Sequence, residues 1–182
     1  YVPNIKLNSD NLTFLNSPDV YIGVLKKNEI LGKLIDKGLE SLTKEDVSLL
    51  KKKWLPVESQ KPEIPEAEEL LTYEERQWVS HQATLKVANE MDLPPFNFSD
   101  NGVPNGYSVD LIKLISEKID LPIEFVDGFT WAEIIEKFKR GELDILPFVH
   151  FTEERNEFMS FTESYESNHS VLVVNEQNTT IK

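Results

Sequence analysis

Residues 143–165, LDILPFVHFTEERNEFMSFTESY, contain the strongest local signals for the fold of this chain. Their first seven residues are apolar apart from Asp144, which predicts a buried strand. Thr152 then has the features of a helix N-cap, and the positive end of the helix dipole stabilises the two negatively charged glutamates that follow it. Arg155 follows in the first turn of this predicted helix, where a cation opposes the dipole.

Two explanations account for Arg155 at this position. It could join the free backbone N–H groups in holding an anion such as a carboxylate, at a strand end that faces a cleft. Alternatively, it could form an ion pair with Glu153, Glu157 or Glu163. The local sequence favours neither.

Charge and composition exclude several classes of function. The 182 residues include 32 acidic and 19 basic side chains, a formal net charge of -13, which argues against nucleic acid and anionic membrane partners. The chain has no cysteine, hence no thiol nucleophile, disulfide or thiolate metal site. No apolar run approaches the roughly 20 residues of a membrane helix, so no direct membrane insertion is expected. Because the chain begins with Tyr1, we expect it to be part of a longer protein.

From residue 85 onward, strands and helices are predicted to alternate. Apolar periodicity predicts strands at residues 85–89, 123–126 and 143–149. Between them it predicts a helix at residues 110–119 and a second helix that begins at Trp131 and is closed by Gly141. Such an order implies right-handed crossovers and a mostly parallel sheet, with ligand groups gathered at the carboxyl ends of the strands.

The part before residue 85 is predicted to form one strand and three helices. A short strand at residues 21–25 precedes two helices at residues 29–42 and 43–54, and Thr43 with Asp46 forms the capping box that marks the start of the second. Residues 57–69 contain two prolines and five glutamates with little apolar content, which is typical of a linker. Thr72 and Glu75 then form a capping box that begins a short helix.

Aromatic residues and one histidine follow the predicted strand ends. Two prolines stiffen the segment that displays Phe96 or Phe98, and Trp131 begins its helix, where it could wall a pocket or cover the sheet. Phe148 and His150 end the third strand. No second histidine or carboxylate lies at metal-ligand spacing from His150, so no metal site is expected.

Six motifs together resemble a known family. They are LPPFNF at 93–98, NGVPNGYSVD at 101–110, Trp131 with its helix, GELD at 141–144, FTEER at 151–155 and FTESY at 161–165. In order and spacing they resemble the first lobe of a family-3 periplasmic solute-binding (Venus flytrap) domain. The resemblance covers roughly residues 70–182, and TYEER at 72–76 is similar to the lead-in of tandem-flytrap sensor histidine kinases.

The resemblance implies an α/β fold: a periplasmic-binding-protein-like lobe with a mostly parallel sheet flanked by helices, preceded by a strand–helix–helix segment. Residues 1–55 resemble the C-terminal tail of an upstream flytrap domain. Residues 56–71 would be an acidic, proline-containing linker. Residues 72–182 would be the first lobe of a second flytrap domain, ending at the hinge.

The implied function is extracytoplasmic sensing, in the bacterial periplasm, of a small carboxylate-bearing, amino-acid-like solute. The clamshell would close over this small-molecule ligand and signal to a downstream kinase or cyclase, without a cofactor and without catalysis. The partners would be a second lobe, a downstream signalling domain and, as a possibility, a homodimer.

Alternative functions are a transport receptor and a flytrap-fold enzyme, either dehydratase-like or fused to a lytic transglycosylase. For the enzyme, Glu90, Asp92 and His150 are the only acid–base candidates in the expected cleft.

Family membership would also give the site residues their roles. Arg155 would hold the ligand carboxylate, Phe96 and Trp131 would flank its body, and the residues leading to Thr152 would add hydrogen bonds. Asp110 and Asp144 also match family positions, and we expect them to be structural: Asp110 opens a helix and Asp144 lies within a strand.

The sequence departs from the family pattern before the predicted helix. Amino-acid-binding relatives carry small hydroxyl residues there, whereas this chain has Pro147, Phe148 and His150. Glu90 maps only loosely onto the acidic residue that often meets an α-amino group.

Overall fold

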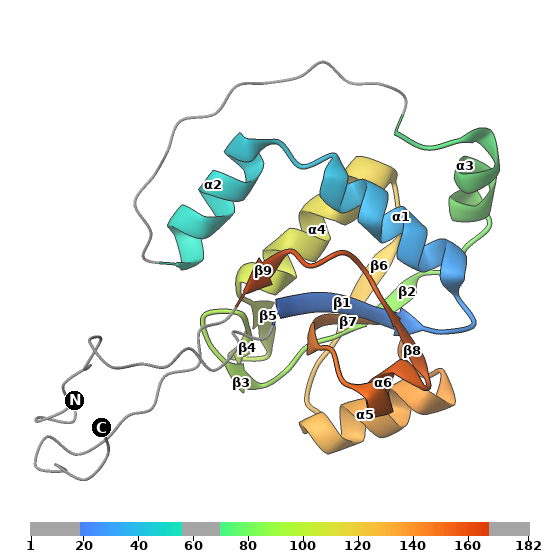
Figure 1. Ribbon diagram of the computed structural model, residues 1–182. Helices are drawn as coiled ribbons and strands as arrows, with labels where there is room; N and C mark the ends of the chain where they lie inside the picture. The colour runs from blue at the N-terminus through green and yellow to red at the C-terminus, as the bar shows by residue number, and fades with distance from the viewer. Residues whose placement is uncertain (1–18, 56–69, 168–182) are drawn as a thin grey trace, which may run out of the picture.

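The computed structural model describes residues 19–55 and 70–167 (Figure 1). The predicted linker at residues 57–69, and a strand expected at residues 170–175 on the way into the hinge, lie outside the described residues.

One mixed sheet forms the centre of the fold, with strand order β6-β2-β7-β1-β8 and β9 pairing with β1. Its strands are β1 (Asp19–Leu25), β2 (Leu85–Ala88), β6 (Ile123–Val126), β7 (Ile145–His150), β8 (Met159–Phe161) and β9 (Glu166–Ser167). β6, β2 and β7 are parallel neighbours, whereas β1 is antiparallel to β7, β8 and β9. Five of the six strands therefore run in one direction, which confirms the predicted mostly parallel sheet.

The register brings the ends of several strands to one edge of the sheet. Leu85 pairs with Ile123 and Ala88 with Val126, so β2 and β6 end side by side. Val20, at the start of the antiparallel β1, pairs with His150 at the end of β7. The carboxyl ends of the parallel strands and the start of β1 therefore meet.

A second, smaller sheet follows β2, where the sequence predicted only a stiff loop. It contains the antiparallel strands β3 (Asp92–Leu93), β4 (Asn97–Asp100) and β5 (Val103–Asn105). Asn101 and Gly102 both have positive φ, 52° and 78°, the backbone that two-residue hairpin turns require. The missed hairpin signal was this Asn–Gly pair between short strand-forming runs.

Six helices complete the described fold. They are α1 (Glu29–Glu40), α2 (Lys44–Trp54), α3 (Tyr73–Ser80), α4 (Tyr107–Ile119), α5 (Trp131–Arg140) and α6 (Glu153–Asn156). Both predicted capping boxes are present, Thr43 with Asp46 and Thr72 with Glu75. α5 ends at Arg140, and the predicted closing residue, Gly141, caps it with a left-handed φ of 75°.

Two expectations about single aspartates need correction. α4 begins at Tyr107, so Asp110 does not open it. Asp110 instead accepts a hydrogen bond from the indole Nε1 of Trp54 at 2.8 Å, which is a structural role of a different kind. Asp144 lies one residue before β7, where it accepts a hydrogen bond from the backbone N–H of Lys86 at 2.9 Å.

The sheet is covered on both faces. α1, α2 and α4 lie on one face and α5 on the other (Figure 1). Successive residues of β7 point into different cores: Ile145 packs in the core under α1 and α4, and Leu146 packs in the core under α5. A strand buried on both faces explains why β7 reads as a continuous apolar run.

The apolar face of the two N-terminal helices packs against this same lobe. Leu34 is fully buried in the core that α4 shares, and Leu39, Leu50 and Trp54 are partly buried against it. These helices therefore make their apolar contact within one chain.

Candidate ligand-binding site

Local sequence and tertiary contacts together position Arg155. β7 ends at His150, and the hydroxyl of Thr152 accepts the backbone N–H of Arg155 at 3.2 Å, which confirms the predicted N-cap of α6. The guanidinium Nη1 donates to the backbone carbonyl of His150 at 2.8 Å. Its carbon lies 5.2 Å from the ring centroid of Trp131. The side chain therefore turns back over the end of β7 and towards α5.

Arg155 has no ion pair among the residues that the structure describes. No carboxylate oxygen of residues 19–55 or 70–167 lies within 4.0 Å of its guanidinium nitrogens, which excludes the predicted alternative of a pair with Glu153, Glu157 or Glu163. An arginine carries five N–H donors, and only one has a partner within these ranges. The remaining donors can take a planar, bidentate acceptor.

Trp131 is the first residue of α5, directly after the loop that follows β6. The capping box of Thr130 and Glu133 sets the start of this helix. The indole is partly exposed, packs on the core under α5 and faces the guanidinium of Arg155. It therefore covers the sheet and borders the strand-end edge at the same time.

The aromatic rings divide into two groups. Phe96 packs on Phe148 with ring centroids 5.1 Å apart, and Phe148 lies edge-on to His150 at 5.5 Å. Phe98 instead packs edge-on against Trp54 of α2 at 5.9 Å. Phe96 therefore belongs to the strand-end group, and Phe98 to the contact with α2.

His150 is a satisfied histidine. Its Nδ1 lies 3.0 Å from the backbone carbonyl of Asp19 at the start of β1. A carbonyl only accepts, so we place the ring proton on Nδ1, which leaves Nε2 as an acceptor. His150 touches Arg155 through its backbone carbonyl, not its ring.

Glu90 follows β2 at the same edge. Its backbone N–H donates to the side-chain oxygen of Asn97 at 3.1 Å, and its carboxyl group is largely buried. Burial raises the pKa of Glu90 to about 7, although the charge of Arg155 lowers it. Within the described ranges, no hydrogen bond reaches this carboxyl group.

A polar network beside Glu90 escaped the sequence reasoning. The fully buried Asn89 donates from Nδ2 to Asp127 Oδ1 at 3.2 Å, and Ser99 Oγ donates to Asp127 Oδ2 at 2.6 Å. Burial raises the pKa of Asp127, but these hydrogen bonds bring it below its usual value. The network ties the loops after β2 and β6 together. Its signal was available: Asn89 is the last residue of one predicted strand, and Asp127 directly follows another.

The predicted site residues thus meet at one open edge of the sheet, and their role in binding stays a prediction. A cavity of about 370 Å³ lies elsewhere, between α3 and the last turn of α4, and contains none of them. Within residues 19–55 and 70–167, no three His, Asp or Glu side chains gather as metal ligands would. Over the same ranges, no helix has the length and apolar character needed to cross a bilayer.

Comparison with known proteins finds sensors and binding proteins. The chain is 26% identical over 164 residues to "Sensor protein EvgS" of Escherichia coli O157:H7, covering 88% of this chain and 14% of that protein. It is 31% identical over 83 residues to "Probable histidine-binding protein" of Campylobacter jejuni, covering 45% and 32%. Among solved structures, "Ancestral Cationic Amino Acid Solute Binding Protein (AncCDT-1)" has 32% identity and a TM-score of 0.39, covering 45% and 36%.

The chain spans no more than 36% of the length of these three proteins. Residues 85–181, more than half of the chain, match the family model of bacterial extracellular solute-binding proteins, family 3. The match includes β2, β6 and β7 and all the residues gathered at their ends. The chain therefore belongs to the bacterial extracellular solute-binding proteins, family 3.

Proposed function

We propose that residues 70–167 are the part of an extracytoplasmic sensor that grips a small carboxylate-bearing, amino-acid-like solute. One observation carries this proposal: the guanidinium of Arg155 is held over Trp131 and forms no ion pair within the described residues. A ligand carboxylate could accept two parallel hydrogen bonds from the free edge of the guanidinium. Trp131 and Phe96 would then border the body of the ligand.

Glu90 supports a ligand that also carries a positive charge. Its carboxyl group lies near Arg155, is largely buried and has no hydrogen bond among the described residues. An ammonium group of the ligand would supply the missing partner and would lower the pKa of Glu90 from about 7. A solute with both a carboxylate and an ammonium group would therefore satisfy both side chains. The name of the histidine-binding relative is in line with such a ligand.

Signalling is proposed on the similarity to the sensor EvgS. That similarity covers 88% of this chain, so it necessarily extends before residue 70 and into the N-terminal part. A transport receptor made of one binding domain would not account for this extent. In the proposed mechanism a second lobe closes over the ligand, and closure shifts a two-state equilibrium that a downstream kinase or cyclase reads.

Calorimetric titration with a panel of amino acids tests the proposal, in a protein extended to include the second lobe. Arg155→Ala should weaken binding at least tenfold, because a charge-assisted hydrogen bond contributes about 1.5–3 kcal/mol. Arg140→Ala is the matched control, since Arg140 is exposed and pairs with Glu142 at 2.6 Å. Unchanged affinity in Arg155→Ala would mean that the site is misplaced.

A dehydratase-like activity is the second candidate, and the raised pKa of Glu90 is the observation that favours it. A carboxyl group with a pKa of about 7 can donate or accept a proton at neutral pH. The other two acid–base candidates support it less: Asp92 is exposed in β3, and the Nδ1 of His150 is engaged by Asp19. Turnover of prephenate or arogenate by the extended protein, lost in Glu90→Gln, would establish this activity in place of binding alone.

A further inference from the structure

The N-terminal segment, residues 19–55, provides the central strand that holds two other strands in the sheet. β1 lies between β7 and β8, and β9 also pairs with β1 (Figure 1). Backbone hydrogen bonds from Thr162 to Ile22 and from Tyr165 to Val20 attach the segment between β8 and β9 to the same strand. The lobe, residues 70–167, therefore depends on β1 for the attachment of its last strands.

The apolar contact between the N-terminal segment and the lobe is closely fitted. Leu34 and Ile35 of α1 are fully buried in the core that includes Leu111 and Ile115 of α4. A Cβ added to Gly38 would collide with the side chain of Ile115, so α1 and α4 approach as closely as a glycine allows. Such a fit is typical of a specific interface.

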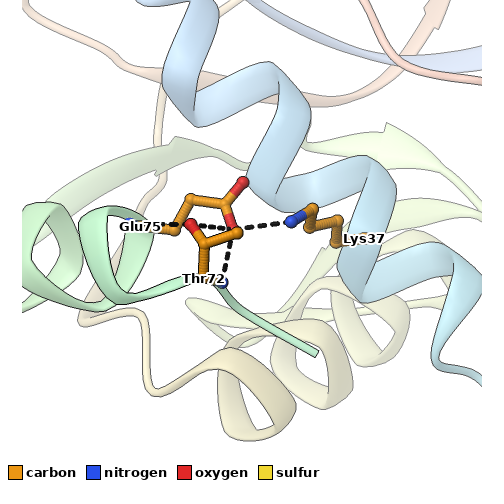
Figure 2. A network of polar contacts seen from close by, with 3 residues as sticks. All are labelled: Lys37, Thr72 and Glu75. Atoms are coloured by element: carbon orange, nitrogen blue, oxygen red, sulfur yellow. Dashed lines mark hydrogen bonds and ion pairs between the residues drawn. The ribbon is translucent and has the colours of Figure 1, made fainter. Parts of the chain in front are cut away.

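Ion pairs also join the two parts. Four of them connect the N-terminal segment to the lobe: Lys37 with Glu75 at 2.6 Å, Lys51 with Glu166 at 2.8 Å, Lys53 with Asp110 at 2.6 Å and Lys118 with Asp46 at 3.1 Å. Figure 2 shows the first of these pairs, in which Glu75 also caps α3 through Thr72.

The overall charges of the two parts are complementary as well. The N-terminal segment has eight lysines and six acidic residues, a formal charge of +2. The lobe has eight basic and 19 acidic residues, a formal charge of -11. Opposite charges favour the contact between the two parts, whether they belong to one chain or to two.

Helix α4 indicates how far the connection between the two parts must reach. Trp54 bonds to Asp110 in the first turn of α4, whereas Leu70 lines a cavity with Ile119 at its last turn. Nine residues of helix separate these two points, about 14 Å along the axis. Residues 56–69 could cover up to about 50 Å when extended, so their length exceeds what this path needs.

We propose that the N-terminal segment is exchangeable, and that the lobe accepts the same segment from a second copy of this chain in a reciprocally exchanged dimer. Every described contact between the two parts is non-covalent and would be reproduced between copies. The exchange also reaches the candidate site, because Asp19 of β1 holds the ring of His150. In the intact chain the connection keeps the segment at an effective concentration in the millimolar range, so the unexchanged monomer predominates at micromolar concentrations.

Shortening the connection tests this proposal. Deletion of residues 57–68 leaves a connection that spans about 10–11 Å, less than the path along α4, so the segment can no longer reach its own lobe. Size-exclusion chromatography with light scattering should then show a folded dimer of twice the mass of the shortened chain, whereas the intact 21.0 kDa chain should elute as a monomer. Deletion of residues 63–68 alone is the matched control: it leaves a span of about 30 Å, and the chain should stay monomeric. A shortened chain that is a folded monomer, or that is unfolded at every concentration tested, overturns the proposal.

Charge reversal then shows which contacts form the dimer. One shortened chain carries Lys37→Glu and Lys51→Glu, and the other carries Glu75→Lys and Glu166→Lys. Either chain alone opposes like charges at both pairs, whereas an equimolar mixture restores opposite charges at both junctions of a heterodimer. Each copy of the chain with Glu75→Lys lacks the capping contact to Thr72 whichever chain it pairs with, so this loss favours neither the homodimers nor the heterodimer. Native mass spectrometry after co-refolding should find mainly heterodimer, and a statistical mixture would show that the dimer uses another surface.

Discussion

Replacing Glu90 by glutamine should change how the stability of the fold depends on pH. The carboxyl group is largely buried at the end of β2, and burial raises its pKa from 4.5 to about 7. Below pH 4.5 it is protonated in the folded and the unfolded chain, so it has no effect. Between pH 4.5 and 7 the unfolded chain loses this proton while the folded chain keeps it. The contribution of Glu90 to the free energy of unfolding therefore falls as pH rises through this window and is constant above it.

The size of the effect follows from the same pKa. At 1.36 kcal/mol for each pH unit, the charged carboxylate destabilises the fold by about 3 kcal/mol above pH 7, and partial contact with solvent reduces this to about 2 kcal/mol. Glu90→Gln removes the charge. Relative to the parent, the variant should gain about 2 kcal/mol at pH 8 and nothing at pH 4.

Urea denaturation at intervals between pH 4 and pH 8, followed by circular dichroism, measures the effect. Glu142→Gln is the control of opposite sign: hydrogen bonds from Arg140 and Lys137 lower the pKa of Glu142 to about 2, so its removal should destabilise the fold at pH 8. If the stability curves of Glu90→Gln and the parent run parallel from pH 4 to pH 8, Glu90 is not buried as described and the reasoning fails.

Other predictions concern packing and binding. Gly38→Ala should lower the free energy of unfolding, measured in urea, by about 1–3 kcal/mol, because the added methyl group collides with Ile115. Gly32→Ala is the control: its methyl group makes only an ordinary contact with Val24, so an equal loss of stability there would contradict this account. In the extended protein, Trp131→Ala should weaken ligand binding more than Phe98→Ala, because Trp131 faces Arg155 whereas Phe98 packs on α2. Equal losses of affinity by calorimetry would assign both rings to packing. The 182-residue chain should bind free amino acids more weakly than ~1 mM, because one lobe leaves the ligand in water, and submillimolar affinity would refute closure as the source of binding.

Signals that lie within a few residues of one another were sufficient to predict much of the fold. The capping pairs Thr43 with Asp46 and Thr72 with Glu75 are three residues apart, and each begins a helix where predicted. The helical periods behind α1, α4 and α5 and the apolar run of β7 are equally local. The meeting of Glu90, Trp131 and Arg155 at one edge also follows from sequence, because parallel strands joined by helices end on the same side.

Tertiary structure alone decided the place of β1, the partner of Arg155 and the pKa of Glu90. In the sequence β1 reads as an isolated strand. Only its antiparallel insertion between β7 and β8 explains how β8 and β9 join the sheet. Several glutamates lie close to Arg155 in sequence, yet its guanidinium turns to the carbonyl of His150 and the ring of Trp131, because strand pairing and helix packing set the direction of the side chain. Likewise, the pKa of Glu90 depends on what buries it. Contacts between residues far apart in sequence supply that burial, and no local pattern encodes them.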